Sequence, residues 1–197
     1  MTTDSARDLV PIAETGEAID LDRVYREHGA TVSRWVRRLS GKSDASDTVQ
    51  EVFEIAQRRL PTFRGDAKPT TWLYAITVRV VSARRRKSRL RELLFLQAKA
   101  EFDLDVTSGE TPADDLRRQQ ATRIVYTILD QLSERDRTLL ILFELERLPT
   151  AEIAAILTIS ENSVSVGLHR ARDRFRKLLR QNFPDEAAGM DHDQSNR

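Results

Sequence analysis

The sequence contains no cysteine among its 197 residues, so it can form neither a disulfide bond nor a thiolate metal site. Glycine (7) and proline (6) are scarce, which excludes collagen-like and loop-rich chains. No apolar run is long enough to span a bilayer, and the acidic N-terminus MTTDSARDLV has no apolar core of a secretory signal. These absences predict a soluble, cytoplasmic protein without membrane insertion.

Charge is abundant but unevenly distributed, although the formal net charge is only +1. Residues 61–100 hold ten Lys or Arg against two Asp or Glu, whereas residues 101–120 hold two against six. A basic block of this kind can attract phosphate, and the acidic stretch that follows restores neutrality. The distribution therefore favours a nucleic-acid partner.

Apolar residues recur at helical spacing over residues 21–95 and again over residues 122–183, and no alternating strand pattern is present. We therefore predict an all-α fold with two small helical domains. Residues 96–121 are polar and acidic, and they are interpreted as a flexible linker. Residues 1–20 are expected to form an N-terminal tail and residues 184–197 an acidic C-terminal tail.

Residues 150–169 have the spacing of a helix-turn-helix. Ala154 is the small residue where the two helices touch, and Ile159 fills the turn between apolar positions on both sides. The second helix of such a unit lies in the DNA major groove, so its outward residues are candidates for reading bases. These candidates are Glu161, Asn162, Ser163, Ser165, Val166 and His169.

Four arginines follow on the same helix and suit phosphate contacts: Arg170, Arg172, Arg174 and Arg176. The alternative interpretation is an ordinary helical hairpin whose basic face is simply solvated. Thr158 stands where such turns usually hold glycine, so either this threonine is strained or the turn has a different geometry.

The first domain combines three aromatic residues, Phe63, Trp72 and Tyr74, with a dense basic run. Aromatic rings beside cations suit single-stranded nucleic acid, in which bases stack and phosphates pair with Lys or Arg. The alternative is that the rings belong to the core, since Trp72 lies on an apolar stripe.

The motifs, in order, resemble an extracytoplasmic-function sigma factor of the sigma-70 family. The resemblance is carried by DASDTVQEVF, by FRGDAKPTTWLYAI with the basic run behind it, and by LSERDRTLLILFELERLPTAEIAAILTISENSVSVGLHRARDRF. It covers residues 21–95 as sigma region 2 and residues 122–183 as sigma region 4. It implies an alternative sigma factor that binds core RNA polymerase and promoter DNA and directs transcription initiation without being an enzyme.

The resemblance also implies roles for individual residues. The helix 44–59 would bind the clamp helices of the largest polymerase subunit through Asp44, Asp47, Gln50, Glu51 and Glu54. The −10 element would be recognised and melted by Phe63, Arg64, Asp66, Thr70, Thr71, Trp72, Arg79, Arg84, Arg85, Arg86 and Lys87. The −35 element would be bound by Glu161, Asn162, Ser163, Ser165, Val166, His169, Arg170 and Arg172. An anti-sigma factor is a further expected partner.

The sequence departs from the family pattern at Pro69, at Arg79 and at residues 165–167, where members often carry an aromatic residue, an asparagine and a basic residue, respectively. The promoter sequence is therefore not inherited from the family. Two other readings stay open: a polymerase-independent helix-turn-helix regulator, and a sigma-like decoy that binds an anti-sigma factor. No metal or cofactor site is expected, because the three histidines are scattered and no phosphate-binding glycine loop is present.

Overall fold

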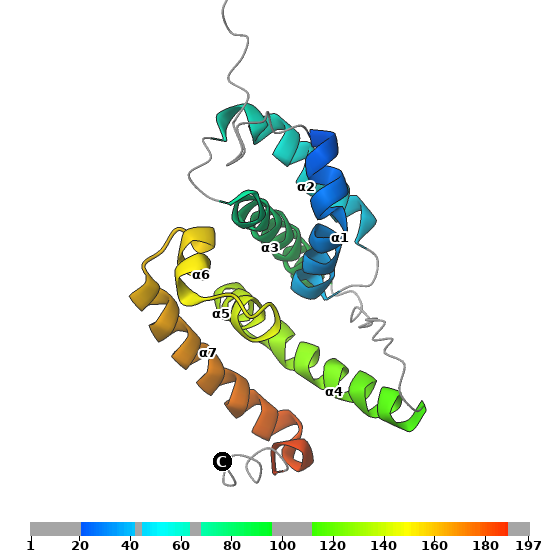
Figure 1. Cartoon of the computed structure of the whole chain (residues 1–197). Coiled ribbons are helices and arrows are strands. Elements are labelled where there is room, and N and C mark those ends of the chain that lie inside the picture. The colour runs from blue at the N-terminus through cyan, green and yellow to red at the C-terminus, as the bar shows by residue number, and fades with distance from the viewer. Residues whose placement is uncertain (1–20, 42–44, 64–67, 96–111, 189–197) are drawn as a thin grey trace, which may run out of the picture. The chain divides into compact units, whose positions relative to one another are not determined.

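The computed structural model describes residues 21–41, 45–63, 68–95 and 112–188, and within these ranges it contains helices and no strand. The prediction of an all-α fold is therefore confirmed for this part of the chain. The helices form two units, α1 to α3 and α4 to α7 (Figure 1). The expected N-terminal tail 1–20 lies outside the described residues.

The first unit contains α1 (Leu21–Ser40), α2 (Ser46–Arg59), the short 3-10 helix η1 (Leu60–Thr62) and α3 (Pro69–Phe95). Helix α1 stops at Gly41, whose positive φ of 73° is a conformation that glycine adopts without steric cost. Proline supports two of the other boundaries, since Pro61 is the second residue of η1 and Pro69 is the first residue of α3. Ala45 occupies the N-cap position of α2, and Ser46 is the first residue of the helix.

Apolar stripes and aromatic pairs hold this unit together. Trp35 of α1 lies 3.9 Å, centroid to centroid, from Tyr74 of α3, and Tyr25 of α1 meets the ring of Phe53 of α2 edge-on at 4.7 Å. The fully buried valines Val32, Val36 and Val52 fill the space between the helices. The three helices thus share one core.

The second unit contains α4 (Pro112–Gln131), α5 (Glu134–Leu140), the π-helical segment η2 (Ile141–Leu145), α6 (Thr150–Leu157) and α7 (Glu161–Asn182). Serine caps two of these helices in the way that short polar side chains favour. The Ser133 hydroxyl accepts a hydrogen bond from the Asp136 amide, and the Ser160 hydroxyl accepts one from the Ser163 amide, each at 3.2 Å. Helix α7 packs on α4, α5 and α6, and it is therefore the central helix of the unit.

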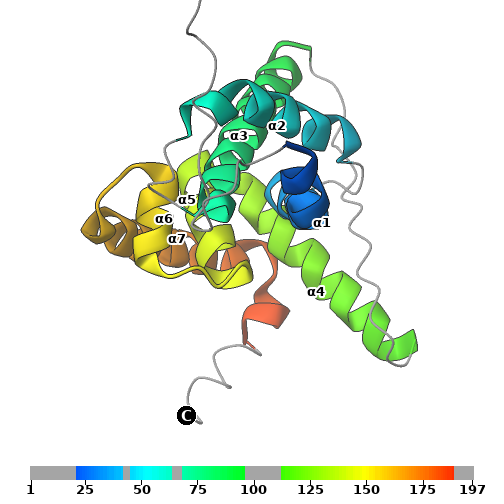
Figure 2. The same cartoon turned by 45° about the horizontal axis from the view of Figure 1, so that its top comes forward.

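Two predicted boundaries differ from the structure. Helix α4 begins at Pro112, so part of the expected linker 96–121 is helical, and residues 96–111 lie outside the described residues. This stretch is polar and shows no apolar stripe, so its composition did not indicate a helix. Proline at the first position nevertheless favours a helix that begins there. Residues 184–188 of the expected C-terminal tail also form a helical turn, coloured red in Figure 2. Ala187 in that turn is buried with Ile128 and Leu179, which anchors the turn to α4 and α7.

The turn between α6 and α7 settles the question that Thr158 raised. Thr158 adopts the left-handed conformation, with φ 58° and ψ 48°, and its amide donates to the carbonyl oxygens that end α6. The turn therefore has the geometry that usually takes glycine, and a β-branched residue occupies it at a steric cost of about 1–2 kcal/mol.

Replacing Thr158 with glycine should remove this steric cost, although glycine loses more conformational entropy on folding. The net result should be a rise of about 1 kcal/mol in the free energy of unfolding of the second unit. Urea denaturation followed by circular dichroism measures this change. The matched control is Thr127→Gly, because Thr127 lies on the exposed face of helix α4, where glycine should destabilise by a few tenths of a kcal/mol or more. Equal destabilisation by both substitutions would contradict the left-handed assignment of Thr158.

Candidate nucleic-acid and polymerase interfaces

Helix α2 presents two faces of opposite character. Val52, Phe53 and Ala56 are buried on the inner face. On the outer face Asp47, Gln50 and Glu54 are exposed and Glu51 is half-exposed, while Asp44 lies outside the described residues. The Gln50 amide donates to the Glu54 carboxylate at 3.0 Å, so these side chains form one polar row. We refer to Asp47, Gln50, Glu51 and Glu54 as the acidic face of α2.

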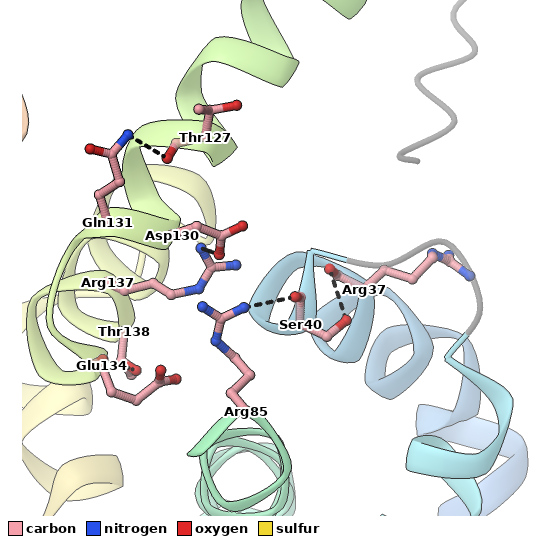
Figure 3. Close-up of polar contacts among 9 residues, drawn as sticks. All are labelled: Arg37, Ser40, Arg85, Thr127, Asp130, Gln131, Glu134, Arg137 and Thr138. Carbon is pink, nitrogen blue, oxygen red and sulfur yellow. Dashed lines mark hydrogen bonds and ion pairs between the residues drawn. The ribbon is translucent and has the colours of Figure 1, made fainter. Parts of the chain in front are cut away.

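The basic run at residues 84–87 of α3 divides into engaged and available cations. Arg84 donates to the Glu51 carboxylate and to the Thr48 hydroxyl of α2, the second contact at 3.1 Å. Arg85 donates to the Ser40 carbonyl oxygen at 3.0 Å, which ties α3 to the end of α1 (Figure 3). Arg86 and Lys87 are exposed and have no ion-pair partner among the described residues. Arg79, which lies on the same helix, is also exposed.

The three aromatic residues of the first unit differ in exposure. Tyr74 is 1% exposed and Phe63 is 9% exposed, so the core interpretation is confirmed for these two rings. Trp72 is half-buried, and its ring lies 5.0 Å from that of Phe63. Phe63 therefore supports Trp72 instead of offering its own face to a base.

The start of α3 holds the rest of the expected −10 group. Thr70 and Thr71 are half-buried in its first turn, beside Trp72. The expected contacts Arg64 and Asp66 lie outside the described residues. The described part of this group is thus a partly exposed indole with two threonines next to it.

Helices α6 and α7 meet at the left-handed turn and form the helix-turn-helix expected from the spacing. Ile153, Val164 and Leu168 are buried between them. The beginning of α7 is exposed at Glu161, Asn162, Ser165, Val166 and His169, whereas Ser163 is half-buried in the capping arrangement with Ser160. The Glu161 carboxylate also accepts from the Thr150 hydroxyl at 3.4 Å.

Gly167 explains why one position of the reading helix carries no basic residue. A Cβ atom at Gly167 would lie 2.7 Å from the Cδ1 atom of Leu139, whose side chain is fully buried in α5. A larger residue here would require the buried Leu139 side chain to shift within the filled core between α5 and α7. Ser165 and Val166, in contrast, are exposed.

The four arginines that follow on α7 differ in the partners they have. Arg172 forms an ion pair with Glu144 at 2.7 Å and lies over the Phe143 ring at 4.9 Å. Arg174 pairs with the buried Asp136, and Arg176 pairs with Asp173 at 3.1 Å. Arg170 is exposed and has no ion-pair partner in the described ranges. It is therefore the cation of this group most available to a phosphate.

Sequence reasoning missed the residues that hold these arginines. Phe143 and Glu144 lie in the π-helical segment, and the extra residue in its turn changes the direction in which their side chains point. No local pattern signals such a segment. The ion pair of Asp136 with Arg174 joins positions 38 residues apart in the sequence, so no local pattern reveals it.

Neither a metal cluster nor a membrane-spanning helix is found among the described residues. No group of three or more His, Asp or Glu side chains there could hold a metal ion. No described helix is both long enough and apolar enough to cross a membrane. His169 lies 3.4 Å from Asp173 on the exposed surface of α7 and belongs to no such cluster.

Comparison with known protein families assigns both units. Residues 24–91 match Sigma-70 region 2, which extends from α1 through the basic run of α3. Residues 122–175 match Sigma-70, region 4, which includes the helix-turn-helix. The acidic face of α2 and the reading helix α7 therefore belong to two regions of one family.

Curated relatives extend the match over nearly the whole chain. It is 31% identical over 171 residues to the ECF RNA polymerase sigma-E factor of Escherichia coli, covering 84% of this chain and 89% of that protein. It is 30% identical over 186 residues to the RNA polymerase sigma-H factor of Pseudomonas aeruginosa, covering 91% of this chain and 96% of that protein. The chain belongs to the extracytoplasmic-function sigma factors of the sigma-70 family. The resemblance stated from the sequence motifs is thus confirmed.

Solved structures show the same fold at lower identity. The sigma factor RpoE in complex with the anti-sigma factor NepR from Bartonella quintana matches with a TM-score of 0.60 at 21% identity, over 83% of this chain and 98% of that chain. CnrH in complex with the cytosolic domain of CnrY matches with a TM-score of 0.56 at 21% identity, over 82% and 88%. Both matches support the sigma-2-like and sigma-4-like domains predicted from the sequence.

Family membership makes this protein an alternative sigma factor, which is a transcription initiation factor. A helix-turn-helix regulator that works without polymerase would not need the region 2 match over residues 24–91.

Proposed function

We propose that this sigma factor binds core RNA polymerase through the acidic face of α2 and directs it to promoters that α3 and α7 recognise. The observation that carries the proposal is that α2 buries its apolar stripe and leaves Asp47, Gln50 and Glu54 exposed, in the unit that matches region 2. Side chains that the fold does not use internally are the natural contacts for a partner. Asp44, just before this helix, belongs to the same proposed surface.

For the −10 element we propose capture of unpaired bases without any catalytic step. Trp72 offers a partly exposed ring for stacking, and Arg79, Arg86 and Lys87 offer exposed cations for the adjacent phosphates. Arg64, Asp66, Thr70 and Thr71 complete the proposed group, while Phe63 and Arg85 hold its framework. Binding energy then offsets the cost of unstacking, which is a few kcal/mol per base. The protein on this account is not an enzyme.

For the −35 element we propose that α7 lies in the major groove. Asn162, Ser165, Val166 and His169 face the bases from its exposed beginning, and Arg170 contacts phosphate. Glu161 and Ser163 contribute less, because Thr150 and Ser160 already engage them. Arg172 acts through Glu144, which fixes its guanidinium and so orients the helix.

The cellular setting follows from the same proposal. A protein that acts with core polymerase works in the cytoplasm, where polymerase and promoter meet. An anti-sigma factor is a proposed further partner, supported by the RpoE structure, which contains the anti-sigma factor NepR. A decoy that only binds an anti-sigma factor would share the fold but would not open promoters.

Promoter opening tests this function directly. With core polymerase and the full chain together, permanganate should oxidise unpaired thymines in the −10 region of a cognate promoter. Core alone and the chain alone should leave the same thymines unreactive. Unreactive thymines in the complete mixture, despite formation of the polymerase complex, would contradict promoter opening. Failure to form that complex as well would favour the decoy.

A second prediction concerns Val166, one of the few large apolar side chains exposed in the described ranges, at 43%. On a helix in the major groove such a side chain can contact the 5-methyl group of thymine. Replacing the contacted thymine by deoxyuridine removes one methyl group, and it should weaken binding about 4-fold, from about 0.8 kcal/mol per buried carbon. Holoenzyme affinity for promoters with single deoxyuridine replacements in the −35 element measures this.

Variants of the same helix provide the controls. Val166→Ser should bind the thymine and deoxyuridine promoters equally, whereas Ser165→Ala should keep the preference. Thymine preference that survives in Val166→Ser would assign the methyl contact to another side chain.

A further inference from the structure

Arg84 connects the two proposed interfaces of the first unit. From α3 its guanidinium donates to three acceptors within about one turn of α2. These are the Glu51 carboxylate, the Thr48 hydroxyl at 3.1 Å and the Asp47 carbonyl oxygen at 3.3 Å. The planar fork of arginine fits such a set of acceptors. Arg84 therefore holds the acidic face of α2 against the helix that carries the −10 contacts.

The contact lies at the surface and can be exchanged. The side chain of Arg84 is 45% exposed and that of Glu51 is 39% exposed. Solvent and salt screen an ion pair in this position, so a partner that offers a better-placed charge can replace either member. The buried Arg137, at 1% side-chain exposure, has no such freedom.

Each member of the pair also belongs to a different interface. Glu51 lies on the acidic face between Asp47 and Glu54, where a protein that docks there would have to present cations. Arg84 precedes Arg86 and Lys87, the exposed cations proposed to contact DNA phosphate. One ion pair thus joins the polymerase-binding surface to the DNA-binding surface.

We propose that Glu51 and Arg84 couple the two binding events. In the free chain, Glu51 holds the guanidinium of Arg84 on α2. When a cation of polymerase pairs with Glu51, Arg84 is released and takes a phosphate oxygen of promoter DNA beside Arg86 and Lys87. By thermodynamic linkage, the phosphate contact in turn raises the affinity for polymerase by the same factor. This inference rests on the proposed function of both surfaces.

The test compares four forms of the full chain: wild type, Glu51→Gln, Arg84→Gln and the double variant. Binding of a labelled −10 DNA fragment is measured against salt concentration, for the free chain and for the holoenzyme. One additional phosphate contact makes the slope of log affinity against log salt concentration more negative. The change is about 0.9 for duplex DNA or about 0.7 for single-stranded DNA. For duplex this is an additional loss of affinity of about 3.5-fold between 50 and 200 mM salt.

In the free chain, Glu51→Gln should add one phosphate contact, and the double variant should return to the wild-type slope. In the holoenzyme, wild type and Glu51→Gln should share one slope, and Arg84→Gln should lose one contact. Glu54→Gln is the matched control, because it removes the same charge from the acidic face without touching Arg84. It should leave the salt slope of the free chain unchanged. Both tryptophans, Trp35 and Trp72, lie in this unit, so their fluorescence verifies that each variant is folded.

Two results would overturn the coupling. An increase in slope for Glu51→Gln that persists in the double variant would show a general charge effect. An unchanged holoenzyme slope for Arg84→Gln would show that Arg84 only braces α2 against α3. The proposed function itself would fail differently, since the wild-type chain would then form no complex with core polymerase.

Discussion

Replacing Arg137 with alanine should lower the free energy of unfolding of the α4–α7 unit by about 3 kcal/mol. Arg137 is fully buried, and its guanidinium donates to the Asp130 carboxylate at 3.0 Å (Figure 3). The same guanidinium lies 5.6 Å from the centre of the Tyr126 ring. Truncation to alanine removes this pair and leaves a cavity as large as most of an arginine side chain, and both losses destabilise a core.

The composition of the chain allows a clean measurement. Both tryptophans lie in the first unit, so tryptophan fluorescence follows that unit while circular dichroism follows all helices. In urea, Arg137→Ala should shift the dichroism transition of the second unit and leave the fluorescence transition in place.

Arg137→Met is the matched control, because methionine keeps most of the apolar stem and removes the charge. Replacing a buried ion pair by an apolar side chain of similar volume is often nearly neutral, so this variant should lose less than half as much. Equal losses for alanine and methionine would show that the ion pair, and not the packing, dominates.

Reversing two charges on the acidic face of α2 should weaken binding to core polymerase about 100-fold, or about 2.7 kcal/mol. The variant is Asp47→Lys with Glu54→Lys, and both side chains are exposed on the face opposite the buried Val52 and Phe53. Lysine near the beginning of α2 costs the helix under about 1 kcal/mol, so the unit should remain folded. Titration of labelled core polymerase with the full chain measures the affinity.

The control changes the same net charge elsewhere. Asp185 and Glu186 are exposed in the helical turn after α7, and replacing both with lysine should leave the affinity for core within about 3-fold, because charges outside an interface affect binding mainly through screened, long-range attraction. Comparable losses in the two double variants would show that net charge, rather than the face of α2, determines binding.

Several elements followed from local sequence because local physics determines them. Apolar spacing predicted the helices, because the side chains that a helix buries recur every three or four residues. Ala154 and Ile159 placed the helix-turn-helix. The order of the motifs indicated the family, which no single motif could have done.

Other features depend on the folded chain. Arg84 and Arg172 look like DNA contacts in a basic run, but α2 and the π-helical segment supply carboxylates that engage them. Those partners lie 33 and 28 residues away along the chain, and no periodicity reveals them. The same is true of Gly167, whose need for a small residue arises from Leu139 of another helix. A basic run on a helix therefore contains fewer cations available to phosphate than its sequence suggests.

The measurement that tests the central claim most directly is run-off transcription from genomic fragments with purified core polymerase and the full chain. The account predicts discrete transcripts from specific start sites that require both components. It also predicts that these transcripts are lost with the Asp47→Lys, Glu54→Lys variant and retained with the Asp185→Lys, Glu186→Lys variant. No specific transcript from any fragment, or transcripts equally strong with the α2 variant, would contradict it.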